Sequence, residues 1–247
     1  MPKPILVVKV GTSTLLGSDE QPSRTFEYVA ESIQAVRKTH DVVLVSSGAI
    51  GFGVRQLQLG ARPTELHHLQ ALSMIGQVGL LRKWREAFEG TTVGQVLVTR
   101  QDLERAGTAG LFRESVRSVW DYGALPIVNE NDAVSTEEIS FGDNDRLAAE
   151  IAVALGAETL VLLTDQDGIQ AKFGTDTQHR LATVTIDEVV GHIQVSKSQL
   201  GKGGATSKIQ AARIALDANI AVYIAHAAQQ HSLEAVLSGK AGTNIVK

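Results

Sequence analysis

The sequence predicts an α/β fold, a three-layer α/β/α sandwich built around a mostly parallel central sheet. Short runs rich in Val, Ile and Leu alternate with longer amphipathic segments along the whole 247-residue chain. The short runs lack polar alternation, which is typical of strands buried on both faces of a parallel sheet. Strands that alternate with helices form βαβ units, and these units build the predicted architecture.

The alternation continues without a low-complexity linker or an internal repeat, so we expect one domain over residues 1–247. The predicted strands are residues 5–10, 42–46, 93–99, 125–129, 159–164 and 221–225. The predicted helices are residues 22–39, 64–89, 109–122, 144–155 and 206–218. In the second helix an apolar stripe near a 3.6-residue period is formed by Leu66, Leu69, Leu72, Ile75 and residues 77–81.

Composition excludes several classes of protein. The chain is 43% hydrophobic and 20% charged, with a net charge of −4, values that are ordinary for a soluble globular protein. A pI near 6.0 and only 4% aromatic residues give no sign of the basic or base-stacking surfaces that bind nucleic acids. No apolar run approaches the roughly 20 residues that span a bilayer. There are no cysteines, which excludes disulfides and thiolate metal sites and agrees with a cytoplasmic location.

Ligands of open α/β sheets bind beyond the carboxyl ends of the strands, so the loops after Val10, Ser46, Asn129 and Thr164 hold the candidate site. The first loop follows "VVKVGTSTLLG", in which Lys9 lies inside an apolar strand. A lysine in a central strand is costly unless its ammonium meets an anion at the strand end. The alternative is a lysine that extends past the edge of the sheet into water.

Two further segments are rich in glycine. In "VLVSSGAIGFGV" small residues would let the backbone approach a ligand and form an anion nest, although a plain glycine-rich turn is the alternative. In "LGKGGATSKIQAARIAL" a glycine-rich turn leads Thr206, Ser207 and Lys208 into a helix, which predicts a phosphate site at the helix N-terminus. The alternative there is Thr206 as an N-cap beside a solvated Lys208.

Acidic and amide residues follow two other strands. "LVLLTDQDGI" places Thr164 and Asp165 at a strand end, and Asp-Gly after them signals a turn. "IVNENDAVSTEEISFGDNDRL" contains two acidic-amide clusters, Asn129–Asp132 and 143–145. Two lysines, glycine-rich turns and carboxylates at one sheet edge favour phosphoryl transfer, a reaction that depends on positioning and on positive charge. Asp143 or Asp145 would then orient the lysines or engage a metal, and Asp132 with the amides would hold a polar substrate.

Five of these segments together resemble the glutamate 5-kinases of the amino acid kinase family. "KVGTSTL", "SSGAIGFG", "NENDAV", "GDND" and "GGATSK" occur in that order and cover nearly the whole chain. The resemblance implies an amino acid kinase-like sandwich. It also implies transfer of a phosphoryl group from MgATP to the γ-carboxylate of L-glutamate, the first step of proline biosynthesis.

The resemblance also implies roles for individual residues. Lys9 and Lys208 would stabilise the transferring phosphoryl group, and Asp145 would organise the two lysines. The residues implied to bind glutamate are Ser47, Asp132 and Asn144. The residues implied to bind ATP are Lys9, Thr164, Asp165, Lys202, Gly203, Gly204, Ala205, Thr206, Ser207 and Lys208. Mg²⁺ would be carried mainly by the ATP phosphates, with no metal ligand assigned in the chain.

Partners are likewise implied: L-glutamate and ATP as substrates, proline as a feedback inhibitor, and a homo-oligomer, dimer or tetramer. The chain departs from the family pattern at Lys202 and Ala205, where threonine and methionine are usual, and it shows no sign of the C-terminal PUA domain that many bacterial members carry. Two alternatives remain open. A kinase acting on UMP, N-acetylglutamate, aspartate or carbamate should lack "NENDAV" and the spaced "GDND", and a non-catalytic sensor should lack a lysine or Asp145.

Overall fold

The protein is built around one large sheet. The structure is a computed structural model that describes residues 2–17, 24–135, 143–171, 175–189, 204–230 and 232–247. Eight strands pair in the order β3-β4-β2-β1-β5-β9-β10-β8. Their bounds are β1 Ile5–Val10, β2 Asp41–Ser46, β3 Val93–Val98, β4 Leu125–Glu130, β5 Thr159–Thr164, β8 Thr183–Thr185, β9 Ala221–His226 and β10 Thr243–Val246. A separate two-stranded ribbon is formed by β6 (Gln170–Ala171) and β7 (His179–Arg180).

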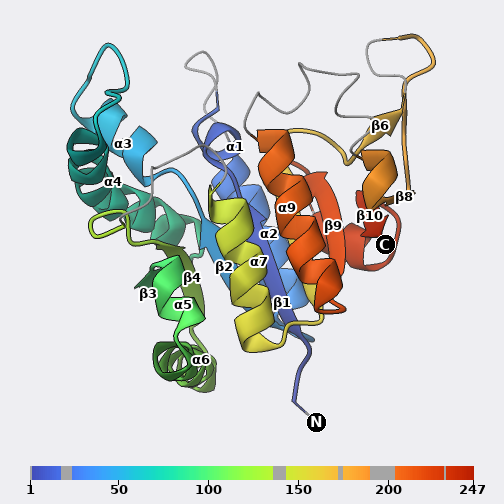
Figure 1. Cartoon of the computed structure of the whole chain (residues 1–247), viewed down its shortest axis with the longest axis horizontal. Coiled ribbons are helices and arrows are strands. Elements are labelled where there is room, and N and C mark those ends of the chain that lie inside the picture. The colour runs from blue at the N-terminus through green and yellow to red at the C-terminus, as the bar shows by residue number, and fades with distance from the viewer. Residues whose placement is uncertain (1, 18–23, 136–142, 172–174, 190–203, 231) are drawn as a thin grey trace.

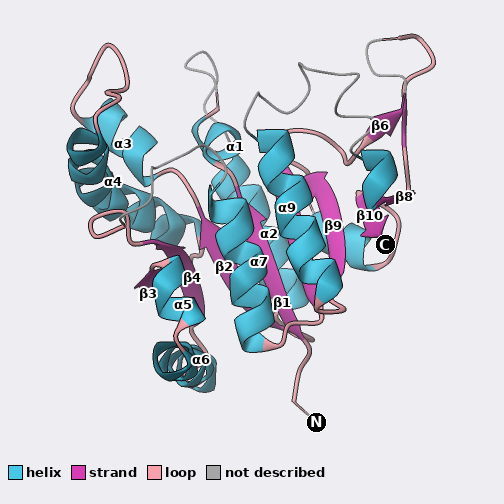
Figure 2. Ribbon diagram, in the orientation of Figure 1, coloured by secondary structure: helices cyan, strands magenta, loops and turns pink. Residues whose placement is uncertain are grey.

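All strand pairs of the large sheet are parallel except β9 with β10, so the prediction of a mostly parallel sheet is confirmed (Figure 2). Helices cover both faces of this sheet. The described helices are α1 Thr12–Leu16, α2 Thr25–Val36, α3 Ala49–Gln56, α4 Leu66–Ala87, α5 Arg100–Glu104, α6 Ala106–Asp121, α7 Asp143–Leu155, α9 Gly204–Asp217 and α10 Ser232–Leu237. In Figure 1, α7 and α9 lie side by side in front of the sheet, and α2 lies behind it.

Alternation along β1 decides which layer each of its side chains enters. Leu6, Val8 and Val10 belong to the apolar core that the sheet shares with α2 and α4. Val7 belongs to the core on the opposite face, which contains buried residues of α7 and α9. Because side chains in a strand alternate between faces, Lys9 is directed to the same face as Val7, beneath α7 and α9. The two helices that carry the other predicted catalytic residues therefore cover the central lysine.

All six predicted strands are confirmed, and all five predicted helices exist with shifted ends. The apolar stripe predicted for α4 is partly wrong. Leu69 and Leu72 are buried as expected, but Leu66 and Ile75 are 39% and 36% exposed. The 3.6-residue period shows which residues share a face of the helix, and it does not show how much of that face a neighbour covers. No helix within the described ranges is long and apolar enough to cross a membrane.

Gly53 of "SSGAIGFGV" and Gly76 of α4 serve helix packing. A Cβ on Gly53 would lie 2.2 Å from the backbone oxygen of Leu72, and one on Gly76 would lie 1.9 Å from the backbone oxygen of Ala49. The backbones of α3 and α4 thus touch at these two glycines. The expectation that these small residues admit a ligand is wrong for Gly53, whose open side faces α4.

Candidate active site

The candidate site lies where the carboxyl ends of β1, β2 and β4 meet. These strands are parallel neighbours, with Lys9 opposite Val45 and Leu44 opposite Ile127. The backbone N–H of Ser47, just after β2, donates to the oxygen of Val10 at the end of β1, 3.1 Å away. This bond ties the first two predicted loops together at one edge of the sheet.

Lys9, Asp145 and Lys208 form a buried group that we call the charge cluster. The Lys9 Nζ lies 2.6 Å from Asp145 Oδ1, and the Lys208 Nζ lies 2.8 Å from Asp145 Oδ2. The side chains of Asp145, Lys9 and Lys208 are 0%, 4% and 12% exposed. The anion that the sequence required for Lys9 is therefore the Asp145 carboxylate, and Lys9 does not extend into water. Of the two aspartates proposed to orient the lysines, Asp145 contacts both, and the side chain of Asp143 lies outside the described residues.

The charge cluster changes the acidity of its members. Burial alone would raise the pKa of Asp145, but the positive charges of Lys9 and Lys208 outweigh it and lower that pKa to about 2. Burial lowers the pKa of Lys9, with a further decrease from Lys208, and the Asp145 carboxylate opposes both effects. Asp145 is thus held as a carboxylate, and the Lys9 ammonium is easier to deprotonate than an ordinary lysine.

Helix α9 brings Lys208 to the cluster from its first turns. The helix begins at Gly204, so Thr206 lies inside it and the alternative in which Thr206 caps it is wrong. Ser207 Oγ donates to Asp145 Oδ2 at 2.9 Å, beside the Lys208 contact. The Lys208 side chain is only 12% exposed and is paired with Asp145, so the alternative of a solvated lysine is also wrong. The N-terminal end of α9, which carries partial positive charge, lies next to two ammonium groups.

Four polar side chains beside the charge cluster form what we call the amide cluster: Ser47, Gln77, Asn129 and Asn144. The Nδ2 of Asn144 donates to Ser47 Oγ at 3.0 Å and to Asn129 Oδ1 at 2.9 Å. The Nδ2 of Asn129 donates to Gln77 Oε1 at 2.8 Å. The two acidic-amide segments of the sequence are therefore joined by a direct hydrogen bond, which the sequence analysis did not predict.

Three other predicted residues lie around these clusters. Asp132 is half-buried in the turn after β4. Burial lowers the pKa of Arg62 below its ordinary value, and the nearby Asp132 carboxylate opposes that decrease without cancelling it. Thr164 is buried at the end of β5, and its Oγ1 accepts from the backbone N–H of Gln166 at 3.0 Å. Asp165 follows it and is exposed. Asp132 thus lies within the electrostatic influence of a cation, whereas Asp165 is open to solvent.

Part of the predicted nucleotide loop lies outside the described residues. Lys202 and Gly203 belong to the undescribed range, and for Gly204 and Ala205 only the helical backbone is described. The predictions for these positions stay predictions.

Sequence reasoning missed two contributors to the site. Gln77 was counted within an apolar stripe, although a glutamine in the run "MIGQVGL" is itself a signal of a polar neighbour. Trp84 Nε1 donates to the buried Ser46 Oγ at 2.8 Å, and this oxygen also donates to the backbone oxygen of Ser47 at 3.1 Å. Nothing in the sequence linked Trp84 to Ser46, because they lie 38 positions apart.

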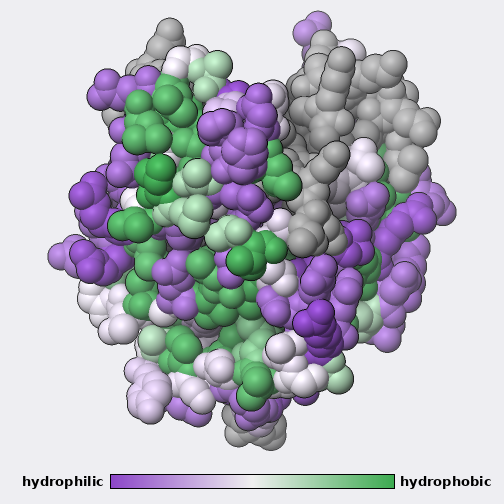
Figure 3. All heavy atoms as spheres, turned by 60° about the vertical axis from the view of Figure 1, so that its left-hand side comes forward, coloured by the Kyte–Doolittle hydropathy of each residue, from purple (hydrophilic) through white to green (hydrophobic). Residues whose placement is uncertain are grey.

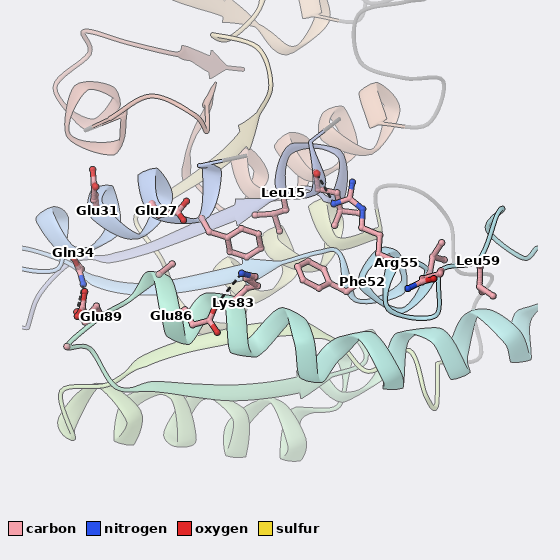
Figure 4. Close-up of a pocket in the computed structure, with 16 residues that line it drawn as sticks. Leu15, Glu27, Glu31, Gln34, Phe52, Arg55, Leu59, Lys83, Glu86 and Glu89 are labelled. Atoms are coloured by element: carbon pink, nitrogen blue, oxygen red, sulfur yellow. Dashed lines mark hydrogen bonds and ion pairs between the residues drawn. The ribbon is translucent and has the colours of Figure 1, made fainter. Parts of the chain in front are cut away.

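A wide cavity of about 1380 Å³ lies apart from the site, between α1, α2, α3 and α4 (Figure 4). Its lining includes the apolar side chains of Leu15 and Phe52 and a paired Lys83 and Glu86. None of the predicted site residues lines it. Within the described ranges there is also no group of three or more His, Cys, Asp or Glu side chains that could hold a metal ion.

The fold and the paired buried lysines identify the class of protein. The pattern of the amino acid kinase family matches residues 4–226, and the chain belongs to that family. Among solved structures, carbamate kinase from Giardia lamblia bound to AMP-PNP aligns with a TM-score of 0.70 at 16% identity, covering 99% of both chains. UMP kinase from Ureaplasma parvum aligns with a TM-score of 0.63 at 14% identity, covering 100% of both chains. These likenesses show the fold alone.

Curated relatives are more similar in sequence, and those described below are named glutamate 5-kinase. The chain is 40% identical to the enzyme of Nocardia farcinica, over 96% of this chain and 66% of the relative. It is 36% identical to that of Bradyrhizobium diazoefficiens, over 95% of this chain and 65% of the relative. It is 36% identical to that of Clostridium acetobutylicum, over 94% of this chain and 90% of the relative. The chain therefore spans a little under two thirds of the length of the first two relatives.

Proposed function

We propose that the chain is a glutamate 5-kinase that transfers the γ-phosphoryl group of ATP to the γ-carboxylate of L-glutamate. The observation that carries the proposal is the charge cluster beside the amide cluster. Two lysines on one carboxylate suit an anionic phosphoryl group, and the amides beside them suit a polar substrate. The identity with relatives of that name supports the choice of glutamate. On this proposal the chain acts in proline biosynthesis, in the cytoplasm.

In the proposed reaction a γ-carboxylate oxygen of glutamate attacks the γ-phosphorus of ATP. A new O–P bond forms, the bond from the γ-phosphorus to the bridging oxygen breaks, and ADP leaves with that electron pair. Lys9 and Lys208 place positive charge beside the oxygens of the transferring group. Asp145 is a positioning residue, because its two oxygens hold the two ammonium groups at 2.6 and 2.8 Å. Little covalent chemistry is required of the protein.

ATP fits the lysine-lined end of α9. Two ammonium groups and the partial positive charge of a helix N-terminus suit the phosphates, and the buried Thr164 ends strand β5, which pairs with β1. Mg²⁺ would neutralise phosphate charge and would be held mainly by ATP oxygens. Asp165, Thr206 and Ser207 complete the described nucleotide residues of this proposal.

Glutamate is proposed to lie against Ser47, Asp132 and Asn144. The carboxylate of Asp132 suits the cationic α-amino group, and the half-buried Arg62 beside it suits the α-carboxylate. Proline carries the same α-carboxylate and a cationic nitrogen. We therefore propose that proline binds here as a feedback inhibitor and competes with glutamate, which inhibition patterns against each substrate would check. Competition with ATP would contradict this assignment.

One assay tests the proposed function against its alternatives. ADP release is measured with glutamate, aspartate, N-acetylglutamate, UMP and carbamate, each with MgATP. We expect turnover with glutamate at least about tenfold more efficient than with any other acceptor, because the site's polar groups would be left unpaired by the wrong one. Preference for another acceptor would identify a sister kinase. ATP binding without turnover of any acceptor would identify a sensor.

We also propose a homo-oligomer that forms through the outer face of α4 and the edge strand β3. Met74, Val78 and Leu97 are 56%, 74% and 41% exposed, and β3 ends the sheet. Figure 3 shows apolar atoms exposed among polar ones on this side of the molecule. A second copy would cover these side chains with an identical face. Light scattering should give at least a dimer, and Val78→Glu should lower the mass. A monomeric wild type at micromolar concentration would contradict the proposal.

A further inference from the structure

The amide cluster is a chain of hydrogen bonds with a fixed direction. Gln77 Oε1 accepts from Asn129 Nδ2, and Asn129 Oδ1 accepts from Asn144 Nδ2. Asn129 Oδ1 also accepts from the backbone N–H of Glu130 at 2.9 Å. A backbone N–H can only donate, so this bond fixes which end of the Asn129 amide faces Glu130. With Asn129 reversed, its NH₂ group would meet another donor.

The orientation of the Asn129 amide also determines how its two hydrogen-bond partners, Gln77 and Asn144, are oriented. Since its NH₂ group points to Gln77, Gln77 must present its carbonyl oxygen there. Since its carbonyl oxygen points to Asn144, Asn144 must present its NH₂ group there. The remaining oxygen, Asn144 Oδ1, is buried and has no hydrogen-bond partner among the described residues. A buried acceptor without a partner is unfavourable until a ligand supplies a donor.

We infer that Gln77 is a positioning residue: together with the Glu130 backbone N–H it holds the Asn129 amide in the orientation that leaves Asn144 Oδ1 as an acceptor for the α-ammonium group of the substrate. The inference rests on the proposed function and adds to it the atom that recognises the ammonium group. An ammonium group donates three hydrogen bonds and can satisfy Asn144 Oδ1, whereas a carboxylate only accepts and cannot. Gln77 does not touch the substrate in this assignment. It acts through Asn129, which it holds by one bond of 2.8 Å.

The packing of α4 explains why Gln77 can play this part. Gly76, its neighbour in the chain, lets α4 touch the backbone of Ala49, and Ala49 begins α3 two positions after Ser47. A side chain at residue 76 would separate the two helices. Gln77 is thereby carried to the end of β4, where its carbonyl oxygen meets Asn129.

Substitution of Gln77 by residues of similar length tests the inference. Gln77→Met removes the strong acceptor, and Gln77→Glu keeps one. Gln34→Met is the matched control, because the Gln34 amide contacts Glu89 and Thr91, away from both clusters. We expect Gln77→Met to raise KM for glutamate about tenfold, the effect of losing one hydrogen bond. Gln77→Glu should recover most of that affinity, and kcat and KM for ATP should change by less than about twofold in either variant.

A second readout uses glutarate, which is glutamate without its ammonium group. The wild type should prefer glutamate, and Gln77→Met should reduce that preference because the Asn129 amide, held then only by the Glu130 backbone N–H, orients Asn144 less firmly. An unchanged KM in Gln77→Met, equal effects of Met and Glu, a loss confined to kcat, or unchanged discrimination against glutarate would each overturn the inference. Failure of the proposed function is distinct, since the wild type itself would then not release ADP with glutamate.

Discussion

The charge cluster and the amide cluster lie side by side at one sheet edge, yet their polar atoms are satisfied differently. In the charge cluster both oxygens of Asp145 contact an ammonium group, and two ammonium groups on one carboxylate leave one positive charge in excess before any ligand arrives. In the amide cluster the oxygen of Asn144 has no partner in the described part of the chain. The first cluster is suited to respond to charge that develops during a reaction. The second is suited to recognise a ligand in its ground state.

The largest effect is expected when the carboxylate that both lysines share is removed. Asp145→Asn should reduce kcat at least as strongly as loss of a lysine, because neither ammonium is then held in place. It should also lower the free energy of unfolding of the apoprotein by about 3–5 kcal/mol, since two buried cations lose their partner. Asp187→Asn is the control, because its pair with Arg213 is largely exposed. Denaturation and steady-state kinetics check both effects. Wild-type stability together with wild-type turnover would contradict the role of the cluster.

Loss of either lysine should act on turnover. Lys9→Ala and Lys208→Ala should each lower kcat roughly 10²–10³-fold with a much smaller effect on KM for glutamate, by analogy with loss of one preorganised donor. Lys83→Ala, which removes a half-exposed lysine paired with Glu86, should change neither constant. Near-normal kcat in Lys208→Ala would remove Lys208 from the chemistry.

Changes at the substrate residues should act on affinity. Asp132→Ala should raise KM for glutamate about 10- to 100-fold, the effect of losing a charge-assisted hydrogen bond, with kcat nearly unchanged. The ammonium group keeps its charge during transfer, so this contact binds ground state and transition state equally. KM for ATP serves as the internal control. Equal weakening of both substrates would place Asp132 elsewhere.

The pH dependence of kcat/KM tests whether the pKa of Lys9 is lowered. Burial lowers its pKa below the ordinary 10.5, so its positive charge is lost at a lower pH than that of an exposed lysine. The ratio kcat/KM for ATP reports on the free enzyme and should fall as pH rises, with a midpoint below 10.5. Lys9→Arg should move this decline to higher pH, because arginine stays protonated. Circular dichroism over the same range separates unfolding from titration. A flat profile up to pH 10.5 would contradict the lowered pKa.

The fold and the charge cluster could be predicted from the sequence because each leaves a local signal. Continuous Val, Ile and Leu runs predicted six strands, and a lysine inside one of them indicated a buried anion. The amide cluster left a weaker signal. Gln77 pairs with Asn129 across 52 positions, and that contact depends on how closely α4 packs on α3. Helix packing at Gly53 and Gly76 is a tertiary property, so local periodicity could not reveal it.

The division of labour between the clusters is tested most directly by comparing Lys208→Ala with Asn144→Ala in one steady-state assay of glutamate and ATP. The account predicts that Lys208→Ala lowers kcat roughly 10²–10³-fold, while Asn144→Ala raises KM for glutamate about 10- to 100-fold and leaves kcat and KM for ATP nearly unchanged. If Asn144→Ala lowers kcat and leaves KM for glutamate unchanged, or if both variants alter the same constant, the two clusters do not divide chemistry from recognition.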